Sequence, residues 1–112
     1  MFAFRARNTA SVPSIYPREA RERLQNEPGI VVLDVRTPEE YADGHLPGSV
    51  LLPLTVVPLR ATEVLPDRDA TIFVYCHSGA RSAQAATLLA RMGYTRVWNL
   101  GGIVHWPYET ER

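Results

Sequence analysis

An α/β fold, in which helices flank a mainly parallel sheet, is predicted by three features of the sequence. Residues 30–33 and 71–75 are largely apolar, uninterrupted runs, which are typical of strands buried on both faces of a parallel sheet. Residues 17–25 and 82–92 show the helical spacing of apolar residues and alternate with these runs. Glycine and proline mark boundaries between the segments. Strands that alternate with helices in this order favour a parallel sheet.

The first helix and a helical turn after the first long strand have local reasons to form. Pro17 suits the first position of a helix, and Ala20 and Leu24 recur four residues apart on one face. Thr37 is expected to cap a short helical turn over residues 38–41. These two segments lie on either side of the predicted strand.

The second half of the chain contains one ambiguous segment and one clear helix. Within residues 54–65, Pro58 either breaks a helix into two pieces or confines it to its C-terminal side. Residues 82–92 carry apolar side chains at positions i, i+3, i+4 and i+7, and Gly93 is placed to end this helix. The four apolar residues are Ala85, Leu88, Leu89 and Met92.

Shorter elements complete the pattern. Short strands are expected at 14–16, at 49–51 and around Val97 and Trp98, with a tight loop at 44–48 and a final turn after Gly101 and Gly102. Residues 1–13 are predicted to be a flexible lead-in, and residues 14–112 a single domain with one core.

The composition excludes several classes of function. Twelve basic residues balance twelve acidic ones, so no nucleic-acid or membrane partner is expected. All basic residues are arginines, which removes Schiff-base chemistry on a lysine. The single cysteine cannot form an intramolecular disulfide, and three scattered histidines do not match the spacing of metal ligands. The N-terminal segment lacks the order of a signal peptide, so a cytoplasmic location is expected.

The only cysteine, Cys76, follows the predicted strand 71–75 and precedes the predicted helix 82–92. A loop in this position directs backbone N–H groups and the positive end of a helix dipole at one point. The pKa of a thiol placed there is expected to fall from about 8.5 into the range of about 3.5–7.5. The alternative is that Cys76 is a small buried hydrophobe. The nearby Gly79 and Arg81 favour the reactive thiolate.

A second polar group is expected at the same edge of the sheet. Asp34 and Arg36 come directly after the strand at 30–33, as Cys76 comes after the strand at 71–75. Ligands of parallel sheets bind outside the carboxyl ends of the strands. The three side chains are therefore predicted to share one edge.

Four blocks of residues, in order, resemble the single-domain rhodanese family of sulfurtransferases. They are 33–36 with 38–41, then 44–48, then 76–82, and finally 101–102 followed by Trp106. The similarity spans roughly residues 14–106. It implies a rhodanese-like three-layer sandwich that uses neither a metal nor another cofactor. It also implies that Cys76 alternates between thiolate and persulfide, taking sulfane sulfur from an anionic donor such as thiosulfate and passing it to cyanide, a thiol or a carrier protein.

The resemblance and the loop position together give roles to the other residues. Arg81 and the backbone amides of the loop are expected to bind the anionic donor; the loop residues are His77, Ser78, Gly79, Ala80 and Ser82. His77 is expected at the rim, where it tunes access, and not as a base. Arg36 either binds the donor or braces the loop. Asp34 and His45 are expected to be structural, His45 by holding the turn at 44–48.

Other functions remain as alternatives. Cysteine phosphatases of related fold place five residues between the cysteine and the arginine, whereas here four residues separate Cys76 from Arg81. The smaller ring suits a sulfur atom better than a phosphate. Arsenate reduction through a second cysteine is disfavoured because no second cysteine exists. A non-catalytic rhodanese-type module for protein interaction or sulfur sensing is the competing class.

Overall fold

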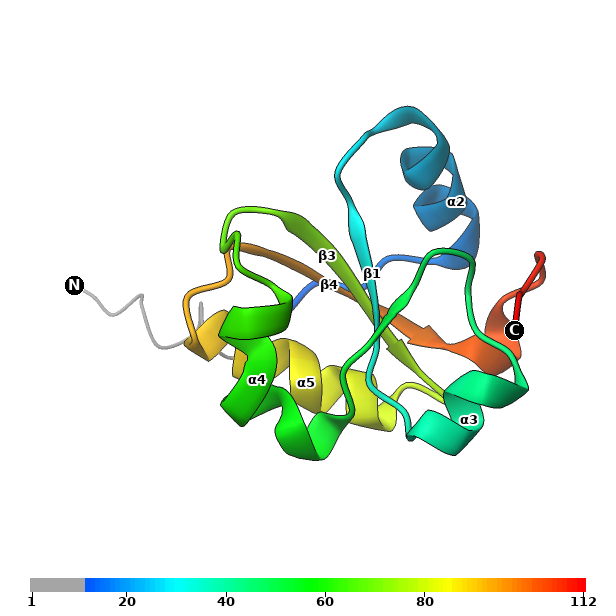
Figure 1. The fold of residues 1–112 in the computed structure, drawn as a ribbon. Coiled ribbons are helices and arrows are strands. Elements are labelled where there is room, and N and C mark those ends of the chain that lie inside the picture. Colours follow the sequence, from blue (N-terminus) through cyan, green and yellow to red (C-terminus); the bar gives the residue numbers. More distant parts are fainter. Residues whose placement is uncertain (1–11) are drawn as a thin grey trace.

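The computed structural model describes residues 12–112, so the predicted lead-in lies almost entirely outside the described residues. Figure 1 shows a sheet with helices on both sides, and the sheet has four parallel strands in the order β2-β1-β3-β4. The strands are β1 (Val31–Asp34), β2 (Val50–Leu51), β3 (Thr71–Cys76) and β4 (Arg96–Gly102). The helices are α2 (Pro17–Asn26), α3 (Pro38–Asp43), α4 (Val57–Val64) and α5 (Ala80–Arg91), with 3₁₀ turns at Leu54–Val56 and Ile103–His105.

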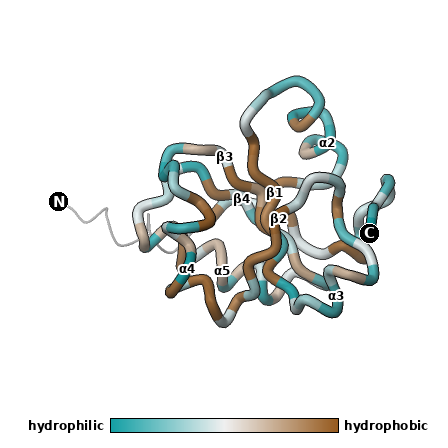
Figure 2. The backbone as a smooth tube through the Cα atoms, in the orientation of Figure 1, coloured by the Kyte–Doolittle hydropathy of each residue, from teal (hydrophilic) through white to brown (hydrophobic). Residues whose placement is uncertain are grey.

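The sheet separates two apolar cores. In β3, Ile72, Val74 and Cys76 point to the face covered by α4 and α5, while Phe73 and Tyr75 point to the face covered by α2. This alternation follows from the period of two in a strand. Apolar residues concentrate in the central strands, and hydrophilic residues cover α2, α3 and the C-terminal segment (Figure 2). The predicted α/β class and three-layer arrangement are confirmed.

Most predicted elements form within a few residues of the expected bounds. Thr37 caps α3 as expected: its side chain accepts a hydrogen bond from the amide of Glu40 at 3.2 Å. Pro58 lies in the first turn of α4, where a missing N–H costs nothing, so the helix occupies the C-terminal part of the ambiguous segment. The strand expected at 14–16 is reduced to a single bridge between Ser14 and Asn99.

The last strand, β4, is longer than the sequence indicates and contains a bulge. Its register with β3 shifts by one residue, since Val74 pairs with Asn99 but Tyr75 pairs with Gly101. Gly101 takes a φ of 91°, which favours glycine. The bulge brings Asn99 and Gly101 toward the start of α5, where the cysteine loop ends.

The parallel topology brings the carboxyl ends of the strands to one edge of the sheet. Asp34 pairs with Tyr75 and Cys76 pairs with Gly102, so these residues lie at one level. Figure 1 shows α3, the start of α5 and the C-terminal segment gathered around this edge. Within residues 12–112, no helix has the length and apolar character needed to cross a bilayer.

Candidate active site

The sulfur of Cys76 lies inside the loop that joins β3 to α5. The amide of Gly79 donates a hydrogen bond to Sγ at 3.0 Å, and the amide of Ser82 donates one at 3.3 Å. Cys76 is only 1% exposed and its strand side packs in the α4–α5 core. The residue is therefore buried, as the hydrophobe interpretation expects, but the loop gives its sulfur a polar environment.

Burial and hydrogen bonding act in opposite directions on the pKa of the Cys76 thiol. Burial is the largest single influence and raises the pKa. The hydroxyl and amide of Ser82, with the amides of Gly79 and Arg81, lower it. These hydrogen bonds together outweigh burial, so the pKa lies below its ordinary value. The direction is the one expected from the position of the loop.

The hydroxyl of Ser82 connects the sulfur to β4. Its Oγ lies 3.5 Å from Sγ of Cys76 and 2.8 Å from Oδ1 of Asn99. Asn99 Oδ1 also accepts a hydrogen bond from the amide of Gly101 at 2.9 Å, which fixes the amide side chain. Sequence reasoning missed Asn99, because nothing in the sequence indicates that the bulge turns its side chain toward the loop.

Two glycines let the loop close over the sulfur. Gly79 has a φ of 114°, a conformation that side chains disfavour. Gly102 is needed for space, because a Cβ there would overlap the carbonyl oxygen of His77 and lie 2.6 Å from Cα of Ser78. The end of β4 therefore packs directly against the backbone of the loop.

Arg81 forms a two-pronged ion pair with Glu40 of α3. Nη1 donates to Oε1 at 2.7 Å and Nη2 donates to Oε2 at 2.9 Å. Hydrogen bonds from Arg81 are the largest influence that lowers the pKa of Glu40, to about 2. Sequence reasoning did not single out Glu40, although its place three residues after Thr37 is the pattern of a capping box.

Asp34 and Arg36 form a buried pair beside the loop. The Asp34 carboxylate accepts hydrogen bonds from Nη2 of Arg36 at 2.7 Å and from the hydroxyl of Tyr75 at 2.6 Å. Arg36 also donates to the carbonyl of Gly44 at 2.8 Å, which ties β1 to the end of α3. Burial raises the pKa of Tyr75, which keeps its hydroxyl protonated as a donor to Asp34.

The two histidines near this edge have different surroundings. His45 is buried and stacked on Tyr41, and its Nδ1 donates to the carbonyl of Tyr41 at 2.8 Å. Its backbone pairs with Glu111, so the turn at 44–48 and the C-terminal segment are held together. His77 is exposed at the start of the loop, and its carbonyl accepts a hydrogen bond from the amide of Val104 at 3.2 Å.

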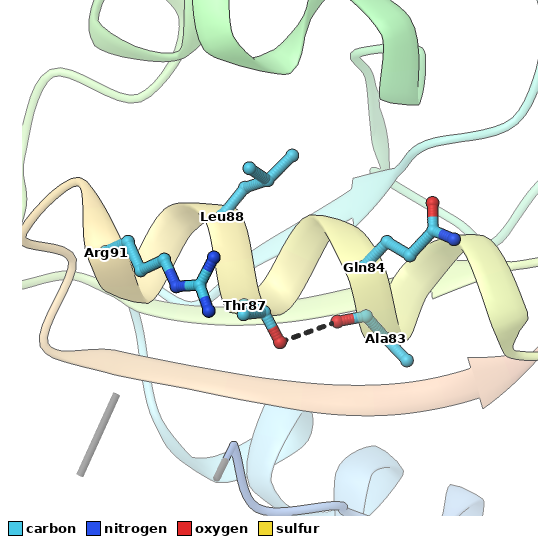
Figure 3. Close-up of a pocket in the computed structure, with 5 residues that line it drawn as sticks. All are labelled: Ala83, Gln84, Thr87, Leu88 and Arg91. Carbon is cyan, nitrogen blue, oxygen red and sulfur yellow. Dashed lines mark hydrogen bonds between the residues drawn. The ribbon is translucent and has the colours of Figure 1, made fainter. Parts of the chain in front are cut away.

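An open hollow of about 430 Å³ lies beside the loop. The hollow lies between the start of the cysteine loop, α3 with its C-cap Gly44, and the C-terminal segment. Its lining residues are Arg36, Glu40, Asp43, Gly44, His77, Ile103 and Thr110. Another hollow, on the outer face of α5, contains none of the loop residues 76–82 (Figure 3). Among residues 12–112, no group of histidine, cysteine and carboxylate side chains is arranged to hold a metal ion.

The chain matches one known protein family. The family model described as "Rhodanese-like domain" matches residues 16–108. The chain belongs to the rhodanese-like sulfurtransferase family. A sulfurtransferase from Allochromatium vinosum is 44% identical to this rhodanese-like domain over 86 residues, 76% of this chain and 78% of that protein.

Two further comparisons extend the likeness. The thiosulfate sulfurtransferase PspE of Escherichia coli is 44% identical over 71 residues, 63% of this chain and 68% of that protein. The solved structure of a rhodanese with anions from Escherichia coli has a TM-score of 0.70 and 37% identity, over 74% of this chain and 98% of that chain. The rhodanese-like fold is therefore shared with chains of similar sequence.

The structure brings together most of the residues singled out in the sequence. Cys76, Arg36 and Asp34 lie at one edge of the sheet, and the loop amides of Gly79 and Ser82 point at the sulfur. The side chain of Arg81 points at Glu40, so its role in donor binding stays a prediction. Ser78 and Ala80 are exposed on the outside of the loop.

Proposed function

We propose that this rhodanese-like domain transfers sulfane sulfur through a persulfide on Cys76. The thiolate attacks the sulfane sulfur of thiosulfate or a similar donor, a new Sγ–S bond forms, and the old S–S bond breaks with its electron pair leaving on sulfite. An acceptor, a thiol or cyanide, then attacks the outer sulfur and returns Cys76 as a thiolate. Each step transfers one sulfur atom and needs no external oxidant.

The observation that carries this proposal is the pair of amide hydrogen bonds to Sγ. The amides of Gly79 and Ser82 can only donate, so they favour the ionised sulfur over the thiol. The start of α5 lies in the same loop, and its positive dipole end favours an anion there. The thiolate is the nucleophile, so the loop keeps Cys76 reactive near neutral pH.

The two arginines take different parts in this proposal. Arg36 braces the edge, because its guanidinium is buried on Asp34 and on the carbonyl of Gly44. Arg81 places a positive charge close enough to Cys76 for each to influence the other, and the raised pKa of Arg81 reflects first Glu40 and then the sulfur among other groups. The charge of Arg81 therefore favours the Cys76 thiolate, and its binding to the donor would require the guanidinium to leave Glu40.

The experiment is incubation with thiosulfate followed by intact-mass measurement. The protein is expected to gain about 32 Da, the mass of one sulfur on a cysteine. Cys76→Ser is expected to gain nothing, and addition of cyanide is expected to remove the gained mass as thiocyanate. If thiosulfate and other sulfane donors leave the mass unchanged, the domain is a non-catalytic module. Rapid hydrolysis of an aryl phosphate without a persulfide would favour a phosphatase.

We also propose that residues 14–112 form one domain that carries the sulfur-transfer site. The family match over residues 16–108 supports this assignment.

A further inference from the structure

We propose that Glu40 and Asp43 of α3 determine donor specificity, by selecting against doubly negative donors and in favour of persulfides flanked by a cationic group. The proposal rests on the sulfur-transfer function above and names the substrate class of the same site. Free thiosulfate is then a usable assay donor but not the donor that the hollow selects.

Both arginines next to the loop are already paired with carboxylates. The two terminal nitrogens of Arg81 bind the two oxygens of Glu40, at 2.7 and 2.9 Å. The guanidinium of Arg36, 5% exposed, binds Asp34, which is fully buried. Neither cation therefore offers an uncompensated charge to an incoming anion.

A further carboxylate, that of Asp43, lines the hollow. Asp43 is exposed at the end of α3, and within residues 12–112 no arginine or histidine nitrogen lies within 4.0 Å of its carboxylate. The charged groups that line the hollow, together with their ion-pair partners, carry one net negative charge when His77 is counted as neutral. They are the carboxylates of Asp34, Glu40 and Asp43 and the guanidiniums of Arg36 and Arg81. The thiolate of Cys76 adds a second negative charge.

Two electrostatic fields act on a donor, one from the loop amides and one from the charged residues of the hollow. The loop amides act at contact distance on the reacting sulfur, and they serve every donor alike. The charge of the hollow acts at longer range on whatever accompanies that sulfur, and exposed charges of this kind steer approach in a salt-dependent way. A dianion is repelled on approach, whereas a persulfide beside an ammonium or guanidinium group is not, because its two charges cancel.

The test compares sulfur loading of Cys76 from two donors, thiosulfate and the persulfide of cysteamine, at low and high salt. In the second reaction the thiolate attacks the outer sulfur and cysteamine leaves as its thiolate. The variants are Asp43→Asn and Glu40→Gln. Glu39→Gln is the matched control, because Glu39 is exposed on the same helix and does not line the hollow. The substitution removes the same formal charge as the other two.

Asp43→Asn is expected to raise the loading rate from thiosulfate about threefold at low salt and to change the rate from cysteamine persulfide much less, because the two charges of that donor cancel. Glu40→Gln is expected to raise the thiosulfate rate further, because it also uncovers Arg81. Added salt is expected to raise the rate from thiosulfate and to leave the rate from cysteamine persulfide nearly unchanged. Since Glu40→Gln also loosens the loop, Asp43→Asn, which leaves Arg81 paired, decides the matter. The proposal is overturned if Asp43→Asn behaves like Glu39→Gln with both donors.

A second measurement separates this proposal from the sulfur-transfer function. If no donor loads sulfur onto the unmodified protein, the function fails, but charge selection is still measured with methanethiosulfonates that carry an ammonium or a sulfonate group. These reagents transfer their thioalkyl group to Sγ and release methanesulfinate. The cationic reagent is expected to react faster, with the difference reduced in Asp43→Asn. Equal rates for the two reagents would end the proposal.

Discussion

At the scale of single residues, the chemistry depends on which atoms can only donate to the sulfur. The amides of Gly79 and Ser82 can only donate to the sulfur. The Ser82 hydroxyl has one proton and four partners, which are Sγ of Cys76, Oδ1 of Asn99 and the carbonyl oxygens of Gly79 and Gly101. With a thiol, the hydroxyl accepts from S–H and donates to one of the three oxygens. With a thiolate, the same proton turns toward the sulfur.

Ser82→Ala is expected to raise the pKa of the Cys76 thiol, because the hydroxyl no longer donates to the thiolate. The measurement is the rate of iodoacetamide alkylation as a function of pH. The control is Ser78→Ala, which removes an exposed hydroxyl from the outside of the same loop. An unchanged midpoint in Ser82→Ala would mean that the hydroxyl proton stays on one of its oxygen acceptors, which are Asn99 Oδ1 and the carbonyls of Gly79 and Gly101.

The residues of the site were predictable to different degrees. Cys76 and Gly79 stand in one short segment of sequence, so local reasoning found them. Glu40 and Asn99 reach the loop only through tertiary contacts across 41 and 17 residues of sequence, to Arg81 and Ser82. No local pattern predicts such contacts, although the spacing from Thr37 to Glu40 matches a capping box.

At the scale of elements, the loop is held between the end of β4 and the start of α3. The backbone of Gly102 lies against residues 77 and 78 from below, and Glu40 holds Arg81 from the side. The sequence predicted α2, β1, β3 and α5 because each has its own periodicity or apolar run. It underestimated β4, since the bulge at Asn99 to Gly101 interrupts the alternation that identifies a strand.

Gly102→Ala is expected to lower the rate of sulfur loading on Cys76 by roughly tenfold or more, because the added Cβ overlaps the carbonyl of His77 and displaces the loop. Intact mass after rapid quenching measures this rate. Gly29→Ala is the control: Gly29 has a positive φ, 87°, which makes an alanine there strained, but a Cβ at this position contacts nothing within 4 Å. Gly29→Ala should lose stability and keep its loading rate, and equal losses in both variants would refute the packing argument.

The ion pair between α3 and α5 should contribute stability over a defined range of pH. The pKa of Glu40, about 2, is below its ordinary value of 4.5, so the contribution is complete above about pH 4.5 and is lost as the pH falls through about 2. Glu40→Gln is therefore expected to unfold more easily in urea than the unmodified protein at pH 6, by about 1 kcal/mol for a partly exposed pair. The difference should shrink toward pH 2.

Glutamine keeps the capping position, so the variant isolates the ion pair. Glu63→Gln is the matched control, because Glu63 pairs with Arg60 on the exposed surface of α4. That variant should change the free energy of unfolding very little at any pH. A difference for Glu40→Gln that persists undiminished at pH 2 would show that the loss comes from packing and not from charge.

At the scale of the whole molecule, one parallel topology accounts for the site. The carboxyl ends of β1 and β3 lie side by side, so Asp34 binds Tyr75 across 41 residues of sequence and lies at the same edge of the sheet as Cys76. This convergence was predictable because it needs only the order of strands and helices. The pairing of Arg81 was not predictable, because the same sequence allows its guanidinium either to bind Glu40 or to stay free for a donor.

The single cysteine determines how the sulfur leaves. A persulfide on Cys76 has no second thiol in the chain to attack it, and the residue is 1% exposed beneath its loop. We expect the sulfur-loaded protein, freed of donor, to keep its added mass until a thiol is supplied. The rate of loss should then rise linearly with the concentration of that thiol and should not depend on the concentration of protein. Intact mass over time measures both dependences, with Cys76→Ser as the blank. Loss that accelerates with protein concentration would instead mean that the thiolate of one copy attacks the inner sulfur of another, which forms a disulfide between the two copies and releases hydrosulfide. That reaction requires the loop to open far enough for one Cys76 to reach another.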